Sequence, residues 1–126
     1  MTRLTRTPFT VHEIGKAVAA ARLTFDLAVL AIRKDAEPYL PHGAYWQNAT
    51  YDTEDGCFKL SYRWAHMTHM LLMIDSDGGV RVEVWSASQT RKPLAVACDQ
   101  GPEATLRSLR KSYPDLAEWR SESATV

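Results

Sequence analysis

The side chains best suited to catalysis or metal binding lie in the middle of the chain, and none of them forms a recognisable motif. His66 and His69 are three residues apart, which in a strand places them on opposite faces and disfavours a shared metal ion. Cys57 lacks a local nucleophile motif, and a free cysteine commonly serves as a small buried apolar residue. Asp75 and Asp77 lack the spacing and the closing glutamate of a calcium loop. The sequence therefore predicts no catalytic residue, no metal ion and no cofactor.

A second group of side chains is better suited to binding another protein. Tryptophan and arginine are enriched at binding hot spots, and here both recur in segments that alternate apolar and polar residues. We expect this group to lie on the outward face of a sheet. For Trp85 the alternative is burial under a second helix, and for Trp46 burial is an equal alternative. The predicted partner-binding residues are Trp46, Lys59, Arg63, Arg81, Glu83 and Trp85.

Two further groups of residues support alternative functions. A pocket between a helix and the sheet would be lined by Tyr45, Tyr62, Trp64 and His69. A basic patch near the C-terminus, which would meet phosphate or an acidic partner, consists of Arg107, Arg110 and Lys111. The alternative for this patch is a solvated helix end whose cations complement the helix dipole.

Composition narrows the classes of partner. The chain has 126 residues, which predicts a single domain, with flexible ends at residues 1–9 and 121–126. Its 15 basic and 15 acidic residues cancel, which argues against a nucleic-acid binder. Two cysteines and an N-terminus without an apolar leader core predict a reducing, cytoplasmic setting. The only long apolar run contains Arg22 and Asp26, which argues against a membrane span.

The longest predicted element is a helix over residues 11–37. Thr10 and Glu13 form a capping box at its start, and Pro38 ends it. Because a helix that is apolar all round is usually buried, we expect its first apolar stripe to lie on a sheet. The second stripe then needs a terminal helix, a second subunit or a partner. The first stripe consists of Ile14, Val18, Ala21, Phe25, Ala28 and Ile32, joined by Val11 and Val29, and the second consists of Leu23, Leu27 and Leu30.

Five strands are predicted after this helix, near residues 45–52, 57–64, 67–75, 80–88 and 94–98. Asp77 and Gly78 are typical of a two-residue hairpin turn, and we assume another tight turn at Ala65 and His66. With the turn at residues 53–56, these turns set three registers that agree on one buried face. That face is predicted to consist of Ala49, Tyr51, Phe58, Leu60, Tyr62, Trp64, Leu71, Met73, Val80, Val82 and Val84.

A second helix is predicted from Pro102, a residue suited to the first helical position, with Leu106, Leu109 and Tyr113 as its apolar stripe. The fold class is therefore α+β, with a long N-terminal helix packed on a four- to five-stranded antiparallel meander, followed by a C-terminal helix. This order resembles the cystatin/NTF2-like layout and the general plan of small bacterial immunity and phage inhibitor proteins. The resemblance covers most of the chain and involves no diagnostic motif, so it implies a fold more than a function.

The function predicted from these observations is a non-enzymatic protein-binding module of the inhibitor, immunity or adaptor type, as in phage or bacterial conflict systems. It rests on the lack of a catalytic constellation and on the surplus of apolar surface. A homodimer through the same surface is compatible with it. The alternative is a small-molecule-binding or enzymatic domain of the cystatin/NTF2-like type, with a pocket between helix and sheet. Nucleic-acid binding by the basic patch together with Arg91 and Lys92 is a third reading.

Overall fold

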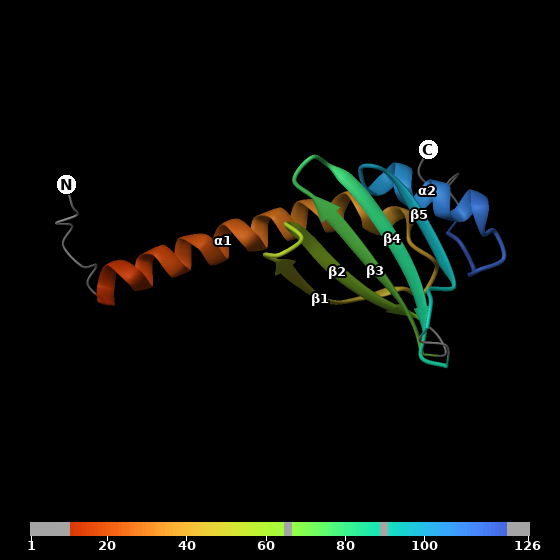
Figure 1. The fold of residues 1–126 in the computed structure, drawn as a ribbon, viewed down its shortest axis with the longest axis horizontal. Coiled ribbons are helices and arrows are strands. Elements are labelled where there is room, and N and C mark those ends of the chain that lie inside the picture. Colours follow the sequence, from red (N-terminus) through yellow and green to blue (C-terminus); the bar gives the residue numbers. More distant parts are fainter. Residues whose placement is uncertain (1–10, 65–66, 89–90, 121–126) are drawn as a thin grey trace.

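The computed structural model describes residues 11–64, 67–88 and 91–120. The antiparallel strands follow one another across a single sheet in the order β1-β2-β3-β4-β5. This arrangement, with a helix before the sheet and a helix after it, confirms the predicted α+β order (Figure 1). Thr10, His66 and both predicted flexible ends lie outside the described residues. The elements are α1 (Val11–Ala36), the short 3-10 helix η1 (Glu37–Tyr39), β1 (Tyr45–Asp52), β2 (Cys57–Trp64), β3 (Thr68–Asp75), β4 (Gly79–Ser86), β5 (Ala95–Gln100) and α2 (Pro102–Ser112).

Both helices pack against the same face of the sheet, which we call the inner face. The C-terminal part of α1 lies over β2, where the ring centroids of Phe25 and Phe58 are 5.6 Å apart. The second helix, α2, lies over β4 and β5 and buries Leu106 and Leu109 completely. One continuous core therefore forms under both helices, and its sheet residues include Leu60, Tyr62, Met70, Leu72, Val82, Val84, Ala95 and Ala97.

The direction in which the side chains of β3 point is the reverse of the prediction. Leu60 pairs with Leu72, and Leu72 pairs in turn with Val82 on β4. Since neighbouring residues of a strand point to opposite faces, Leu72 faces the core. The prediction that Leu71 and Met73 are buried on the inner face was therefore wrong.

This reversal comes from the two loops that flank β3. Each loop holds three residues, 65–67 and 76–78, instead of the two that were predicted. The last residue of each loop has a positive φ, 61° at Met67 and 85° at Gly78. A residue in this conformation lets a three-residue loop close the hairpin. Because two one-residue errors change parity twice, the residues of β4 still face the way that was predicted.

Trp46 lies on the inner face, contrary to its predicted place on the outer face. The pairing of β1 with β2 shifts between Trp46 and Asn48, so that Trp46 pairs with Tyr62. The two rings meet edge to face with their centroids 5.4 Å apart. A bulge of this kind changes the facing of every residue beyond it. Trp46 is therefore partly buried against the core and does not lie on the outer face.

Only the C-terminal part of α1 packs on the sheet. From Phe25 onward its core side becomes progressively buried, and Val29 and Ala36 are 7% and 0% exposed. All side chains of residues 15–24 are exposed, and this part of the helix extends past the sheet (Figure 1). We call residues 15–24 the extension. The prediction that the whole first stripe lies on the sheet was wrong, because Val18 is 62% exposed.

The second apolar stripe of α1 faces solvent in the described chain. Leu23, Leu27 and Leu30 are 60%, 58% and 58% exposed. Because α2 lies on the other side of α1, over β4 and β5, it does not cover them. The expectation that α1 is a helix buried within the fold was therefore wrong. The sequence suggested that a terminal helix, a second subunit or a partner would cover this stripe, and the structure excludes the terminal helix.

Candidate functional site

The outer face of the sheet carries most of the predicted partner-binding residues. No described helix lies on it, because α1 and α2 both pack on the inner face. The strand register places side chains in rows, one of which holds Lys59, Met73, Arg81 and Cys98. The next rows bring Leu71 beside Glu83 and, further along, His69 beside Arg63 and Trp85. The structure thus brings together five of the six predicted residues: Lys59, Arg63, Arg81, Glu83 and Trp85.

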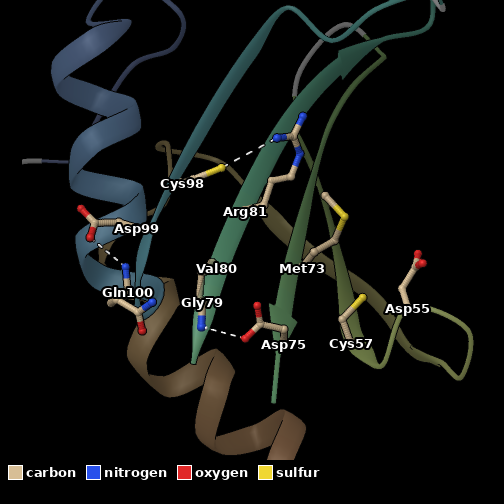
Figure 2. A pocket seen from close by; sticks show the side chains of 10 residues that line it. All are labelled: Asp55, Cys57, Met73, Asp75, Gly79, Val80, Arg81, Cys98, Asp99 and Gln100. Carbon is tan, nitrogen blue, oxygen red and sulfur yellow. Dashed lines mark hydrogen bonds between the residues drawn. The ribbon is translucent and has the colours of Figure 1, made fainter. Parts of the chain in front are cut away.

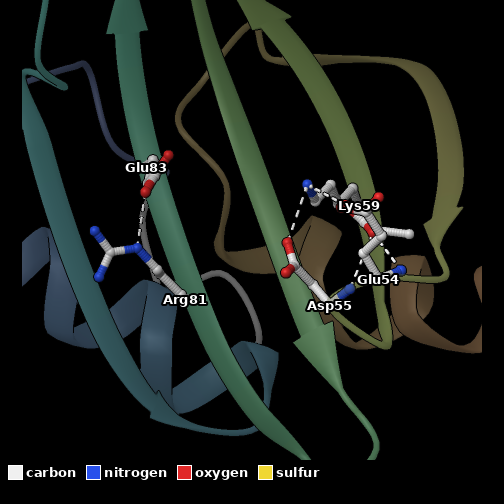
Figure 3. A network of polar contacts seen from close by, with 6 residues as sticks. Glu54, Asp55, Lys59, Arg81 and Glu83 are labelled. Atoms are coloured by element: carbon white, nitrogen blue, oxygen red, sulfur yellow. Dashed lines mark hydrogen bonds and ion pairs between the residues drawn. The ribbon is translucent and has the colours of Figure 1, made fainter.

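At one end of the outer face, charges of opposite sign neutralise one another (Figure 3). Lys59 Nζ donates to Asp52 Oδ2 at 2.9 Å and lies 3.8 Å from Asp55 Oδ2. The hydrogen bond from Lys59 lowers the pKa of the Asp52 carboxyl to about 2.

A second pair lies on β4, where Glu83 accepts two bonds. Arg81 Nε donates to it at 2.7 Å and Trp85 Nε1 at 3.0 Å. The hydrogen bond from Arg81 to Glu83 also raises the pKa of the Arg81 guanidinium. Since Lys59, Arg81 and Glu83 are paired, they offer oriented polar groups and do not form a field of one sign.

A shallow hollow of about 550 Å³ lies at the hairpin end of the outer face and is lined by both cysteines (Figure 2). Burial raises the pKa of the Cys57 thiol, which keeps it protonated. Cys98 is exposed, and Arg81 Nη1 lies 3.8 Å from its Sγ. None of the residues that line the hollow is a histidine.

Asp75 lines this hollow, and its carboxylate stabilises a turn. Asp75 Oδ1 accepts the backbone N–H groups of Asp77 and Gly79, both at 2.9 Å. Among residues 11–64, 67–88 and 91–120, no three His, Cys, Asp or Glu side chains gather in a way that could hold a metal ion. The arrangement is suited to contact with another surface and offers no nucleophile–base pair.

A polar cluster that sequence reasoning missed ties the end of α1 to β2. Glu37 Oε2 accepts from Arg33 Nε at 2.6 Å and from the Tyr62 hydroxyl at 3.0 Å. The Arg33 guanidinium also lies over the Trp46 ring, 4.2 Å from its centroid. Burial and the nearby Glu37 carboxylate raise the pKa of Tyr62. The only sequence signal was the i, i+4 spacing of Arg33 and Glu37 just before Pro38.

The cavity beside this cluster is too small to serve as the predicted pocket. Its volume is about 120 Å³, whereas ligand pockets usually measure roughly 300–1,000 Å³. Of the four predicted lining residues only Tyr62 reaches it. The prediction that the four share one pocket was wrong, since Tyr45 and His69 pair with Arg63 on the outer face while Tyr62 and Trp64 face the core.

The basic patch of α2 is partly engaged in holding the fold together. Arg107 Nε lies 3.4 Å from Glu103 Oε2, and its guanidinium lies 5.1 Å from the ring centroid of Tyr39. Arg110 Nη1 donates to the backbone carbonyl of Arg120 at 2.7 Å. Lys111 is exposed in the last turn. Two of the three cations thus pack against neighbouring elements.

Four large apolar side chains of α1 face solvent. Val18, Leu23, Leu27 and Leu30 are each more than half exposed on one continuous helix. The three leucines share one side of the helix, and Val18 lies nearly opposite them. Single exposed apolar residues are ordinary, whereas a contiguous set such as the three leucines usually marks a contact site. The sequence identified the leucines as a stripe but did not show that Val18 would also face solvent.

Comparisons with known proteins leave the chain without a relative from which a function could be carried over. No protein-family model, no curated protein and no solved structure matches it. Within the described part of the chain, no helix is both long enough and apolar enough to span a bilayer. The function must therefore be inferred from the surfaces themselves.

Proposed function

We propose that this protein is a non-enzymatic protein-binding module, of the inhibitor, immunity or adaptor type, that acts by occupying a surface of another protein chain. The observation that carries the proposal is the solvent exposure of α1. Leu23, Leu27 and Leu30 stand 58–60% exposed along one side of this helix. An amphipathic helix that lays an apolar face into a partner's groove is a recurring mode of protein recognition.

The free energy available from covering this helix is sizeable. Complete burial of a Leu or Val side chain stabilises by roughly 1.5–3 kcal/mol. The three leucines, each about 60% exposed, retain roughly 1–2 kcal/mol each, or on the order of 4 kcal/mol together. Association costs about 4–15 kcal/mol in lost translational and rotational freedom. The helix thus supplies an apolar anchor, and additional contacts must complete a tight complex.

The outer face of the sheet is a second, separate candidate surface, on the opposite side of the molecule from the leucines of α1. Its charged groups are held in place by one another, as Arg81 and Glu83 show with their 2.7 Å contact. Preorganised polar groups at the rim of an interface add specificity and speed of association more than affinity. Trp85, whose ring nitrogen donates to Glu83 at 3.0 Å, adds an aromatic group to the same face.

The test is quantitative capture of partners by tagged protein, with one variant for each surface. Val18→Glu and Leu27→Glu place charges on α1, and Arg63→Glu with Trp85→Ala alters the outer face. All four side chains lie outside the core or are only partly buried, so folding, checked by circular dichroism, should be retained. We expect a specific partner that Val18→Glu or Leu27→Glu loses.

Each captured protein is then purified and titrated against the wild type and the variants. Loss of binding only in the outer-face variant would move the binding surface to the sheet. If no captured protein binds the purified wild type directly, the proposed function is wrong.

A further inference from the structure

We propose that the second stripe of α1 pairs with the same stripe of a second copy of this chain, in antiparallel orientation, as a weak and reversible dimer. The inference rests on the proposed function, because it names the occupant of one side of the binding helix. The other side of the extension, which carries Val18, stays free for a different protein.

The spacing along this stripe is that of a helix pair. Ala20, Leu23, Leu27 and Leu30 follow in steps of three, four and three, the a/d spacing of a heptad. We call these four residues the leucine seam. In an antiparallel pair, the register that sets Leu23 of one copy against Leu27 of the other also sets Ala20 against Leu30. The seam is therefore complementary to itself, with Ala20 opposite Leu30 at each end and leucine against leucine at the centre, as a two-fold symmetric interface requires.

The globular body does not obstruct this pairing. The buried residues of α1, Val29 and Ala36, and the partly buried Phe25 and Ile32 define the side that packs on the sheet. At 3.6 residues per turn, the leucine seam lies nearly opposite that side. Two copies can thus join their seams while both sheets remain outside the helix pair.

The helix dipoles favour the antiparallel orientation. The antiparallel register sets Lys16 of one copy against Lys34 of the other at each end, with Glu13 and Asp35 beside them. A parallel pair would set Lys16 against Lys16 and Lys34 against Lys34, which is the same number of like-charge contacts, and would also align the two helix dipoles. The formal net charge of zero means that two copies do not repel each other as whole molecules.

The area of such a pair sets its strength. Residues 13–35 of α1 extend for about 33 Å at 1.5 Å per residue, and a helix about 10 Å across buries roughly 400 Å² of its side surface in such a contact. A stable standard interface buries about 800 Å² per partner. The pair is therefore about half the size of a lasting dimer, and we expect it to be weak, with a dissociation constant in the micromolar range.

The first experiment measures molar mass by sedimentation velocity from about 1 to about 200 µM, a range that brackets micromolar dissociation constants. Wild-type protein is expected to pass from one chain to two across this range. Leu27→Glu, at the centre of the seam, is expected to remain monomeric throughout. Val18→Glu is the matched control, because it adds the same charge to the same helix at 62% exposure but off the seam, and it should dimerise like the wild type.

Orientation is tested by disulfide trapping in a Cys98→Ser background, since Cys98 is the exposed native thiol. An antiparallel pair cross-links an equal mixture of Ala20→Cys and Leu30→Cys chains but not Ala20→Cys chains alone. A parallel pair cross-links Ala20→Cys chains alone, and that result would overturn the orientation proposed here.

The outcomes separate this proposal from the proposed function. Wild-type protein that stays monomeric at about 200 µM, or a dimer that Leu27→Glu leaves intact, overturns the pairing through the seam. If in the same preparation a different purified protein binds and is lost in Leu27→Glu, that protein occupies the seam, and the protein-binding function stands. If the seam dimerises but no other protein binds, the pairing stands and the binding of other proteins fails.

Discussion

The reversed facing of β3 leads to a sharp prediction about two neighbouring leucines. Leu72 is 0% exposed and lies between Leu60 and Val82 on the inner face, whereas Leu71 lies on the outer face and is only partly buried. Leu72→Ala removes buried carbon atoms and leaves a cavity, so we expect it to lower the free energy of unfolding by about 3 kcal/mol. Leu71→Ala should lower it by less than about 1 kcal/mol.

Urea denaturation followed by tryptophan fluorescence and circular dichroism measures both changes. Native domains have free energies of unfolding of roughly 5–15 kcal/mol, so Leu72→Ala should still fold, with an unfolding midpoint about 10 °C lower in a thermal scan. Leu72→Val, expected to cost about 1 kcal/mol, keeps the comparison measurable if the alanine variant fails to fold. If Leu71→Ala proves as costly as Leu72→Ala, the register of β3 described here is wrong.

Three further predictions use the polar contacts and the thiols. Tyr62→Phe removes the hydroxyl that donates to the Glu37 carboxylate, so urea denaturation should show that the free energy of unfolding falls by about 1.5 kcal/mol. No measurable fall would mean that this hydrogen bond is not made. Because the folded pKa of Asp52 is lowered from 3.8 to about 2 by Lys59, its contribution is present above pH 3.8 and is lost as the pH falls toward 2. In Asp52→Asn the urea midpoint should therefore vary less with pH between those two values than it does in the wild type. An unchanged slope of midpoint against pH would contradict this. Of the two thiols, Cys98 should react quickly with an aromatic disulfide reagent and Cys57 only at the rate of unfolding, so a fast phase that survives in Cys98→Ser would refute the assignment.

The sequence was sufficient to predict the order and type of the elements, because their signals are local. The predicted bounds of β1 and β2 agree with the structure, and α1 ends one residue earlier than predicted, before Pro38. Strict alternation over residues 57–64 indicates a strand whatever it pairs with. The same local signals marked Leu23, Leu27 and Leu30 as a stripe, and the structure leaves that stripe exposed on α1.

The length of α1 shows that the sheet cannot cover the whole helix, which local sequence patterns do not reveal. A helix of 26 residues is about 39 Å long, whereas five strands spaced about 4.8 Å apart are roughly 20 Å across from the first to the last. The sheet must also accommodate α2, so it cannot cover the whole of α1. Since residues 37–44 are a short connection to β1, the C-terminal end of α1 is the part that stays on the sheet.

The composition of the two sheet faces was decided only by the tertiary structure. A two-residue loop and a three-residue loop differ by one backbone step, and that step depends on the φ of single residues such as Met67, at 61°. A non-glycine residue rarely adopts a positive φ, so the sequence offered no reason to expect this conformation at Met67. The sequence likewise offered no reason to expect the bulge after Trp46. Elements follow from local periodicity, whereas the facing of their side chains follows from pairing, in which a shift of one residue turns every side chain to the other side.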